Sequence, residues 1–262
     1  MPSKPTKQKR PTKIEAAFFD VDNTILRGSS TFLWGQAAFR YGYFSRKDLW
    51  RFAYQQFMFI WRGEGATNLS KMLDKALSLI EGHSATSLTA MADEVYTKYF
   101  KPKLWPETVR IAKAHVAAGR EVWLVTAAPQ EIADVLAHRL GLTGGIGTLI
   151  ERDGDILTGK LVGKALHGKA KRRAVKAMAK ERHISLRRSY AYSDSSNDLP
   201  MLTAVGHAVA VNPDKRLAAY AKAASWPMLD FKRRELKANE QVSRAQRKAL
   251  EVKEVKHSKP GK

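Results

Sequence analysis

Two short acidic segments of the chain combine residue types that suit phosphoryl chemistry. Residues 20–24 read Asp-Val-Asp-Asn-Thr, and residues 194–198 read Asp-Ser-Ser-Asn-Asp. Each follows a short apolar run, residues 16–19 and 190–192, of the kind that forms a buried strand. The carboxyl ends of parallel strands meet at one edge of a sheet, where such folds bind ligands. Carboxylates gathered there are the oxygen ligands that a hard divalent cation such as Mg²⁺ requires.

Asp20 and Asp22 are spaced to act on one small volume, because both follow directly as the chain leaves its strand. A carboxylate can attack phosphorus when a cation screens the repulsion and a second acid protonates the leaving oxygen. Acidic turns after strands are also common for purely structural reasons. Two such segments, with Thr126 ending a third predicted strand, favour a site over that structural interpretation. We therefore expect a magnesium-dependent phosphoryl-transfer enzyme.

The composition favours a soluble, cytoplasmic protein. The 262 residues are 44% hydrophobic and include no cysteine, which excludes disulfides, thiolate zinc sites and cysteine nucleophiles. No run reaches the roughly 18 apolar residues that a transmembrane helix needs. The basic N-terminus also lacks the apolar stretch of a secretory signal.

The net charge of +21 is large and partly concentrated at the two ends of the chain. A basic field attracts nucleic acid, anionic lipid and small phosphoesters alike. No nucleic-acid recognition motif is evident, so specific nucleic-acid binding is not expected. Peripheral contact with an anionic membrane stays open, as does the simpler interpretation of a solubilising surface.

The pattern of apolar residues predicts an α/β fold, a Rossmann-like doubly wound parallel sheet with an inserted all-helical cap. We assign the catalytic core to residues 14–27 and 104–230, and the cap to residues 28–103. Residues 1–13 form a basic N-terminal tail. Residues 231–262 form a basic C-terminal tail, disordered or a frayed helix.

The expected elements alternate along the core. Strands are predicted at 15–20, 121–126, 190–194, 208–211 and 227–229, with short strands over 144–161 that turn at Asp153. Helices are predicted in the core at 106–118, 130–140, 169–182, 199–205 and 214–224, and in the cap at 45–61, 68–80 and 87–99. The glycines of residues 141–147 lack the ending of a phosphate-binding loop and favour a helix C-cap and turn.

Over roughly residues 15–230 the chain resembles the haloacid dehalogenase superfamily, in particular the phosphoserine-phosphatase-like group with a helical cap after the first strand. The first motif of that family, Asp-x-Asp-x-Thr, matches residues 20–24. The resemblance implies that Asp20 is the nucleophile that forms an aspartyl-phosphate. It also implies that Asp22 is the general acid and then the base, and that its backbone carbonyl binds Mg²⁺.

The remaining motifs follow in the family's order. Thr126 matches the second, which implies that its hydroxyl binds the phosphoryl group, helped by the Ala127 amide at a helix N-terminus. The fourth motif matches residues 194–198, which implies that Asp194 binds Mg²⁺ and Asp198 orients metal-bound water. The resemblance thus places four aspartates at the metal and three residues at the substrate: Asp20, Asp22, Asp194 and Asp198, then Thr126, Ala127 and Asn197.

The third motif is a lysine whose cation screens the nucleophile and the phosphate. The candidates are Lys164, Lys169, Lys171 and Lys176. Lys171 fits best, because it precedes Asp194 by 23 residues, the family's spacing. A solvated basic helix face is the alternative for each of the four.

Two departures from the family pattern bear on the substrate. Phosphoserine phosphatases carry a glutamate for the substrate ammonium where residues 27–30 contain no acid. They carry a cap arginine for the substrate carboxylate where our alignment places Ala76. Phosphoserine is therefore disfavoured. The helix predicted over 48–62 is apolar around most of its circumference, which fits a buried cap bundle, a dimer contact, or an entrance for an acyl chain or membrane.

The leading hypothesis is a magnesium-dependent phosphomonoester hydrolase acting through phospho-Asp20 on a lipid phosphate or on histidinol phosphate. One alternative is a phosphotransferase with the same intermediate. Another is a basic protein that binds nucleic acid or a membrane surface on an inactive catalytic fold. Oligomerisation is left open.

Overall fold

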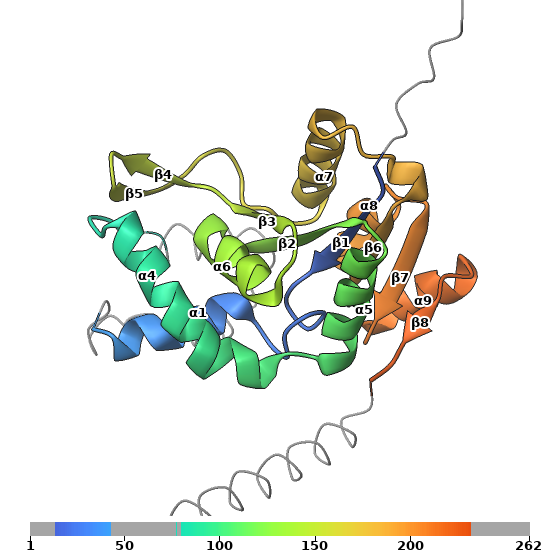
Figure 1. Cartoon of the computed structure of the whole chain (residues 1–262), viewed down its shortest axis with the longest axis horizontal. Helices are drawn as coiled ribbons and strands as arrows, with labels where there is room; N and C mark the ends of the chain where they lie inside the picture. Colours follow the sequence, from blue (N-terminus) through green and yellow to red (C-terminus); the bar gives the residue numbers. More distant parts are fainter. Residues whose placement is uncertain (1–13, 43–76, 78–79, 232–262) are drawn as a thin grey trace, which may run out of the picture.

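The computed structural model describes residues 14–42, 77 and 80–231, and it contains a six-stranded sheet in the order β3-β2-β1-β6-β7-β8 (Figure 1). Every neighbouring pair in this sheet is parallel. Its strands are β1 (Ala16–Asp20), β2 (Glu121–Pro129), β3 (Gly144–Thr148), β6 (Tyr190–Ser193), β7 (His207–Val211) and β8 (Met228–Leu229).

The central strand β1 decides where the acidic segments meet. It is buried along its whole length and pairs with β2 on one side and β6 on the other. Phe19 lies in register with Leu124 and with Tyr192. The three strands therefore end side by side, and both acidic segments come to the same edge of the sheet.

Helices cover both faces of the sheet, which confirms the predicted doubly wound α/β fold. On one face, α5 (Pro106–Ala117) and α6 (Gln130–Leu140) contribute to a core that includes Phe19 and Tyr192. On the other face, the core around Phe18 and Val125 is closed by three helices: α7 (Lys169–Glu181), α8 (Leu199–Leu202) and α9 (Lys215–Ala223).

Between β1 and α5, the regular elements that the structure describes are helical. They are α1 (Ser30–Arg40), α4 (Ala85–Val95), a π-helical turn over Tyr96–Phe100 and a 3-10 turn over Lys101–Lys103. The helix predicted over 87–99 corresponds to α4 and the π-helical turn. The helices predicted over 45–61 and 48–62, and most of the one over 68–80, lie outside the described residues. None of the helices in the described part of the chain is long and apolar enough to cross a membrane.

Of the tails predicted at 1–13 and 231–262, residues 1–13 and 232–262 lie outside the described residues, so the predicted domain boundaries stay a prediction. Phe231, the first residue assigned to the C-terminal tail, is described. Its backbone N–H donates to Asn212 Oδ1 at 2.8 Å, and its ring packs 6.0 Å from that of Trp105.

A separate hairpin of β4 (Ile150–Asp153) and β5 (Ile156–Leu161) turns where the sequence predicts, and it reaches the cap. Asp155 at its turn caps α4, because its carboxylate accepts from the backbone N–H and the hydroxyl of Thr86 at 3.0 and 2.8 Å. Figure 1 places this hairpin beside α4. These hydrogen bonds therefore join the hairpin of the core to the first turn of α4 in the cap.

The glycines of residues 141–147 do more than the predicted cap and turn. Gly141 is the C-cap of α6 with a positive φ of 64°, as expected. Gly145, however, lies in β3, where an added Cβ would come within 2.6 Å of Ala133. Glycine there allows α6 to lie directly on the strand.

Candidate active site

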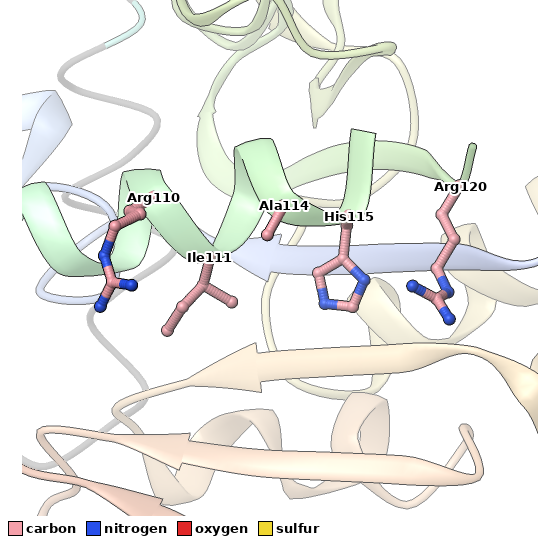
Figure 2. A pocket seen from close by; sticks show the side chains of 5 residues that line it. All are labelled: Arg110, Ile111, Ala114, His115 and Arg120. Carbon is pink, nitrogen blue, oxygen red and sulfur yellow. The ribbon is translucent and has the colours of Figure 1, made fainter. Parts of the chain in front are cut away.

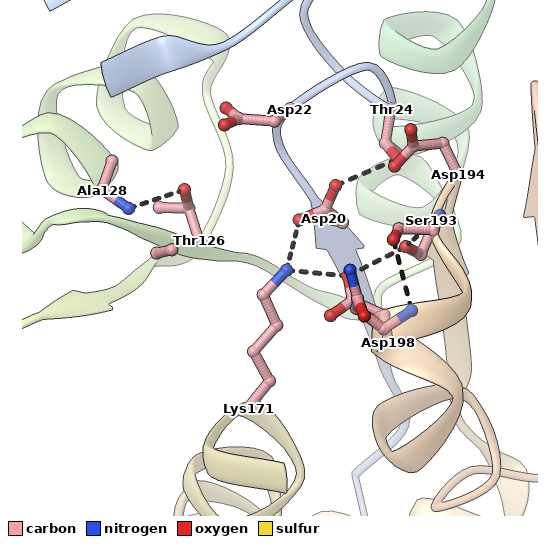
Figure 3. Close-up of polar contacts among 12 residues, drawn as sticks. Asp20, Asp22, Thr24, Thr126, Ala128, Lys171, Ser193, Asp194 and Asp198 are labelled. Carbon is pink, nitrogen blue, oxygen red and sulfur yellow. Dashed lines mark hydrogen bonds and ion pairs between the residues drawn. The ribbon is translucent and has the colours of Figure 1, made fainter. Parts of the chain in front are cut away.

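A buried ion cluster occupies the carboxyl ends of β1 and β6 (Figure 3). Asp20 is the last residue of β1, and Lys171 extends toward it from the first turn of α7. The Lys171 Nζ contacts Asp20 Oδ1 and lies 2.7 Å from Asp198 Oδ2. One ammonium group therefore joins the two acidic segments that the sequence singled out.

Helix α7, which carries Lys171, begins after a glycine with a positive φ. Gly168 is the N-cap of this helix with a φ of 53°, a left-handed conformation that favours glycine. Lys171 is only 4% exposed, whereas Lys164, Lys169 and Lys176 are exposed. Burial alone would lower the pKa of Lys171, but the negative charges of Asp20 and Asp198 outweigh it and raise that pKa.

Asp194 completes the acidic cluster through Thr24. The Thr24 hydroxyl lies 3.2 Å from Asp20 Oδ2 and 3.5 Å from Asp194 Oδ1. Burial raises the pKa of Asp194 to about 7, and burial together with the neighbouring aspartates raises the pKa of Asp20 well above its ordinary value. Three carboxyl groups thus face one lysine, an excess of two negative charges in a largely buried volume when all are ionised.

Asp198 is held in place by two hydrogen bonds besides its burial. Its Oδ2 accepts from Lys171 Nζ and, at 2.9 Å, from the Ser193 hydroxyl, whose oxygen in turn accepts from the Ser195 backbone N–H. Sequence reasoning gave no role to Ser193 or to Thr24. Two sequence signals could have pointed to a role in the site. Ser193 lies near the end of a predicted strand, and Thr24 lies inside the first acidic segment.

The loop over residues 194–198 is fixed from behind by Asp214. Its carboxylate accepts from the backbone N–H groups of Ser196 and Leu217, both at 2.7 Å, and its own N–H donates to the Asp194 carbonyl. Asp214 is therefore the N-cap of α9, and its backbone bond also fixes the position of the metal-binding candidate Asp194.

The Asp22 side chain takes a different direction from the cluster. Its Oδ1 accepts from the backbone N–H of Ser30 at 2.8 Å, so the carboxylate is held by the first residue of α1. Figure 3 shows it pointing away from Asp194 and Thr24. The candidate general acid is thus positioned by the cap and not by the core.

Thr126 lies at the same edge with a hydroxyl ready to donate. Its Oγ1 accepts from the Ala128 N–H at 3.1 Å, which leaves the hydroxyl hydrogen free for an acceptor. Ala127 differs from expectation: β2 continues to Pro129 and α6 begins at Gln130, so the Ala127 amide is not at a helix N-terminus. The pairing of β2 with β3 is irregular between Val125 and Pro129. Asn197 is exposed at the rim.

The donor set fits a cation that takes oxygen ligands from only two carboxylates. Within the described ranges, no three histidine or acidic side chains converge as a metal centre. The Asp22 carboxylate accepts from the Ser30 N–H, and Lys171 and Ser193 both donate to Asp198. Asp20 and Asp194 both lie within reach of the Thr24 hydroxyl, and the assignment of Asp20, Asp22, Asp194 and Asp198 to the metal stays a prediction.

The chain is similar to known phosphatases over most of its length. A family described as haloacid dehalogenase-like hydrolase matches residues 17–203. A Mycobacterium tuberculosis protein named phosphoserine phosphatase SerB1 is 44% identical over 218 residues, covering 83% of this chain and 71% of the relative. A protein of Neisseria meningitidis serogroup C named histidinol-phosphatase is 30% identical over 220 residues, covering 82% and 98%.

Solved structures agree with this similarity. A crystal structure of a protein of unknown function from Bordetella pertussis Tohama I superposes with a TM-score of 0.74 at 29% identity, covering 84% of this chain and 99% of that one. The matched family region contains both acidic segments, residues 20–24 and 194–198, and also Lys171. The chain therefore belongs to the haloacid dehalogenase-like hydrolase family and is a phosphatase of that family.

Proposed function

We propose that this phosphatase hydrolyses phosphomonoesters with Mg²⁺ through an aspartyl-phosphate on Asp20, and that phosphoserine is not its preferred substrate. The observation that carries the proposal is the contact of Lys171 Nζ with both Asp20 and Asp198 in a buried site. An ammonium group at this position screens the nucleophile from an incoming phosphate.

The residues of the site divide the reaction between them. Lys171 and the Thr126 hydroxyl bind the phosphoryl oxygens, and an Asp20 carboxylate oxygen attacks phosphorus as the bond to the leaving oxygen breaks. Asp22 donates a proton to that oxygen. It then removes a proton from the water that attacks the acyl-phosphate and regenerates Asp20. The bond from the Ser30 N–H sets the direction of the Asp22 carboxylate.

Magnesium fits the charge of this site. Asp20, Asp194 and Asp198 exceed Lys171 by two negative charges when ionised, the charge that one divalent cation balances. Asp20, Asp194 and the backbone carbonyl of Asp22 are the groups that would hold the ion. When bound, it would neutralise the charge of the phosphate and of the attacking carboxylate.

The described edge of the cap argues against an amino-acid substrate. No acidic residue occurs in the sequence between Asp22 and Asp48, so neither the linker nor α1 offers a carboxylate to a substrate ammonium. Phe32, in the first turn of α1, is 68% exposed instead. This favours a substrate with an apolar or aromatic body, such as a lipid-derived phosphate or an aryl phosphate. Ala76, which the alignment places where phosphoserine phosphatases carry the cap arginine, lies outside the described residues.

The test is phosphate release from a panel of esters in Mg²⁺ and in EDTA. The panel holds phosphoserine, histidinol phosphate, lysophosphatidate, phosphatidylglycerophosphate and a chromogenic aryl phosphate. We expect turnover that EDTA removes reversibly, with kcat/KM for phosphoserine at least about tenfold below the best ester. Phosphoserine as the best substrate would contradict the substrate class, and EDTA-resistant turnover would contradict the metal.

The covalent intermediate has its own test. Borohydride reduces an aspartyl-phosphate to homoserine, so protein quenched during turnover should carry homoserine at position 20 in peptide mass spectra. The matched control is Asp22→Asn, which keeps the candidate nucleophile. Label at another residue would reassign the nucleophile, and phosphate recovered on an added alcohol instead of water would identify a transferase.

A further inference from the structure

A row of cations runs along the outer side of α7, the helix whose inner side supplies Lys171 to the catalytic edge. The buried side of this helix repeats every four positions: Lys171, Val175 and Ala179. The exposed cations repeat at intervals of four, three and four residues on the opposite side: Lys169, Arg173, Lys176 and Lys180, with Arg172 beside them. These five exposed residues are called the basic row below.

The charge of the basic row is not balanced by its surroundings. No acidic residue occurs in the sequence from Gly168 to Lys180. Within the described part of the chain, none of the five cations forms an ion pair or a side-chain hydrogen bond. Arg182, just after the helix, differs because it pairs with Glu121 at 2.7 Å. The row is about 16 Å long, and unpaired charges over this length attract an extended anionic surface.

Exposed aliphatic side chains adjoin the start of α7. Leu149 and Val162 are 51% and 56% exposed, and their backbones are neighbours because the Val162 N–H donates to the Leu149 carbonyl at 2.9 Å. The Leu166 N–H donates to Thr148 Oγ1 at 3.0 Å, which joins this pair to the segment that leads into the helix. Cations beside exposed aliphatic groups are typical of surfaces that contact a lipid bilayer.

The same surface lacks the groups that proteins use to bind single-stranded nucleic acid. Such proteins stack bases on aromatic side chains placed along a basic groove. Among the described residues, the exposed aromatic side chains lie in or next to α1 and in α9 instead: Phe32, Tyr41 and Tyr220. The neighbours of the basic row therefore favour a lipid surface over a nucleic acid.

We propose that the basic row is a docking surface for an anionic lipid bilayer. Its ammonium and guanidinium groups contact the phosphates of the lipid headgroups, and Leu149 and Val162 enter the interface between headgroups and acyl chains. Each cation near such a surface contributes about fivefold in affinity. Docking requires no turnover, so the proposal goes beyond the proposed function and can be tested independently of it.

The experiment measures co-sedimentation of the full-length protein with phosphatidylcholine vesicles that contain or lack phosphatidylglycerol. It is run at about 0.1 M and about 0.5 M NaCl. We expect binding to the anionic vesicles only, and weaker binding at the higher salt because the charges are screened. No binding to the anionic vesicles, or equal binding to both compositions, would overturn the proposal.

Two matched double variants make the test specific to α7. Arg173→Gln with Lys176→Gln removes two cations of the basic row and should weaken vesicle binding at least tenfold. Arg110→Gln with Lys113→Gln removes the same residue types at the same spacing from α5, on the opposite face of the sheet, and should bind within twofold of the parent. Circular dichroism checks that both variants fold. Equal weakening by the two pairs would overturn the proposal.

A third variant separates a lipid surface from a nucleic acid as the partner. Val162→Ser removes an exposed aliphatic side chain and no charge, so it should weaken vesicle binding at least threefold. Binding of a fluorescent single-stranded oligonucleotide should not change in this variant. An unchanged vesicle affinity would overturn the choice of a lipid surface, as would an oligonucleotide that binds through the basic row when the anionic vesicles do not.

Discussion

The catalytic edge and the surroundings of His115 in α5 (Figure 2) both contain buried titratable groups, yet the two regions differ in charge. At the edge, three carboxyl groups lie near one lysine, so the cluster carries excess negative charge when all three are ionised, and burial raises the pKa of Asp20 and of Asp194. On the α5 side, burial and the nearby Arg120 lower the pKa of His115 to about 4, so a neutral imidazole is bonded to Tyr192. Buried charge costs stability and is kept where chemistry needs it, whereas a neutral polar pair is compatible with packing.

This difference predicts that substitutions at the catalytic edge lower activity first, while changes around His115 lower stability first. The largest expected effect comes from Asp20→Asn, because the amide is a poor nucleophile. We expect kcat to fall by about 10⁴-fold or more, with an unchanged fold. Activity assays and circular dichroism check this. Residual turnover within tenfold of the parent would refute Asp20 as the nucleophile.

Lys171→Met should lower both activity and stability, so the contrast between the two regions does not hold for this residue. It removes the cation that would screen the phosphate, which costs about 10²- to 10³-fold in kcat. It also leaves Asp20 and Asp198 facing each other without their counter-charge, which costs about 3–5 kcal/mol in unfolding free energy. Urea denaturation and kinetics measure the two effects. The matched control is Lys176→Met, an exposed lysine of the same helix, which should change neither.

His115 predicts a loss of stability in acid. Its pKa is about 4 in the folded protein and about 6.5 when unfolded, so only the unfolded chain takes up a proton between these values. The contribution is fully present above pH 6.5 and falls by up to about 3 kcal/mol as the pH drops to 4. Urea midpoints at several pH values test this, and His115→Gln should flatten the difference over that window. An equal slope in the variant would assign the loss to other groups.

The smallest effect should come from Ser30→Pro, which tests how the cap positions Asp22. Ser30 is the first residue of α1, where proline is well tolerated, but the substitution removes the N–H that bonds Asp22. We expect kcat to fall about tenfold through the loss of one charge-assisted hydrogen bond, with little change in melting temperature. Ser30→Ala keeps the N–H and should retain activity, and equal losses in both variants would argue against the positioning role.

The sequence was most informative where a pattern was local. The bounds of α6 agree with the prediction at both ends, because Pro129 precedes it and Gly141 caps it. The prediction ended β2 at Thr126, whereas the strand continues to Pro129, since the irregular pairing with β3 leaves no signature in the sequence. The candidate site residues near strand ends were foreseeable for the same local reason.

What escaped prediction depends on contacts between distant segments. Asp155 caps α4 from about 70 residues further along the chain, and no local motif announces such a bond. Thr24 joins Asp20 to Asp194 only because β1 and β6 are neighbours in the sheet. The orientation of Asp22 toward Ser30 likewise follows from where the cap begins.

The central place of β1 in the sheet has a consequence for biosynthesis. Its first residue, Ala16, bonds to Ser189, 173 positions later in the chain. At about 5–20 residues per second, the ribosome needs about 9 to 35 s to make the intervening segment. Strand β1, which is buried along its whole length in the folded protein, therefore lacks one of its two neighbours throughout that time. Chaperone supply during translation, more than the stability of the finished enzyme, should then limit the yield of active protein.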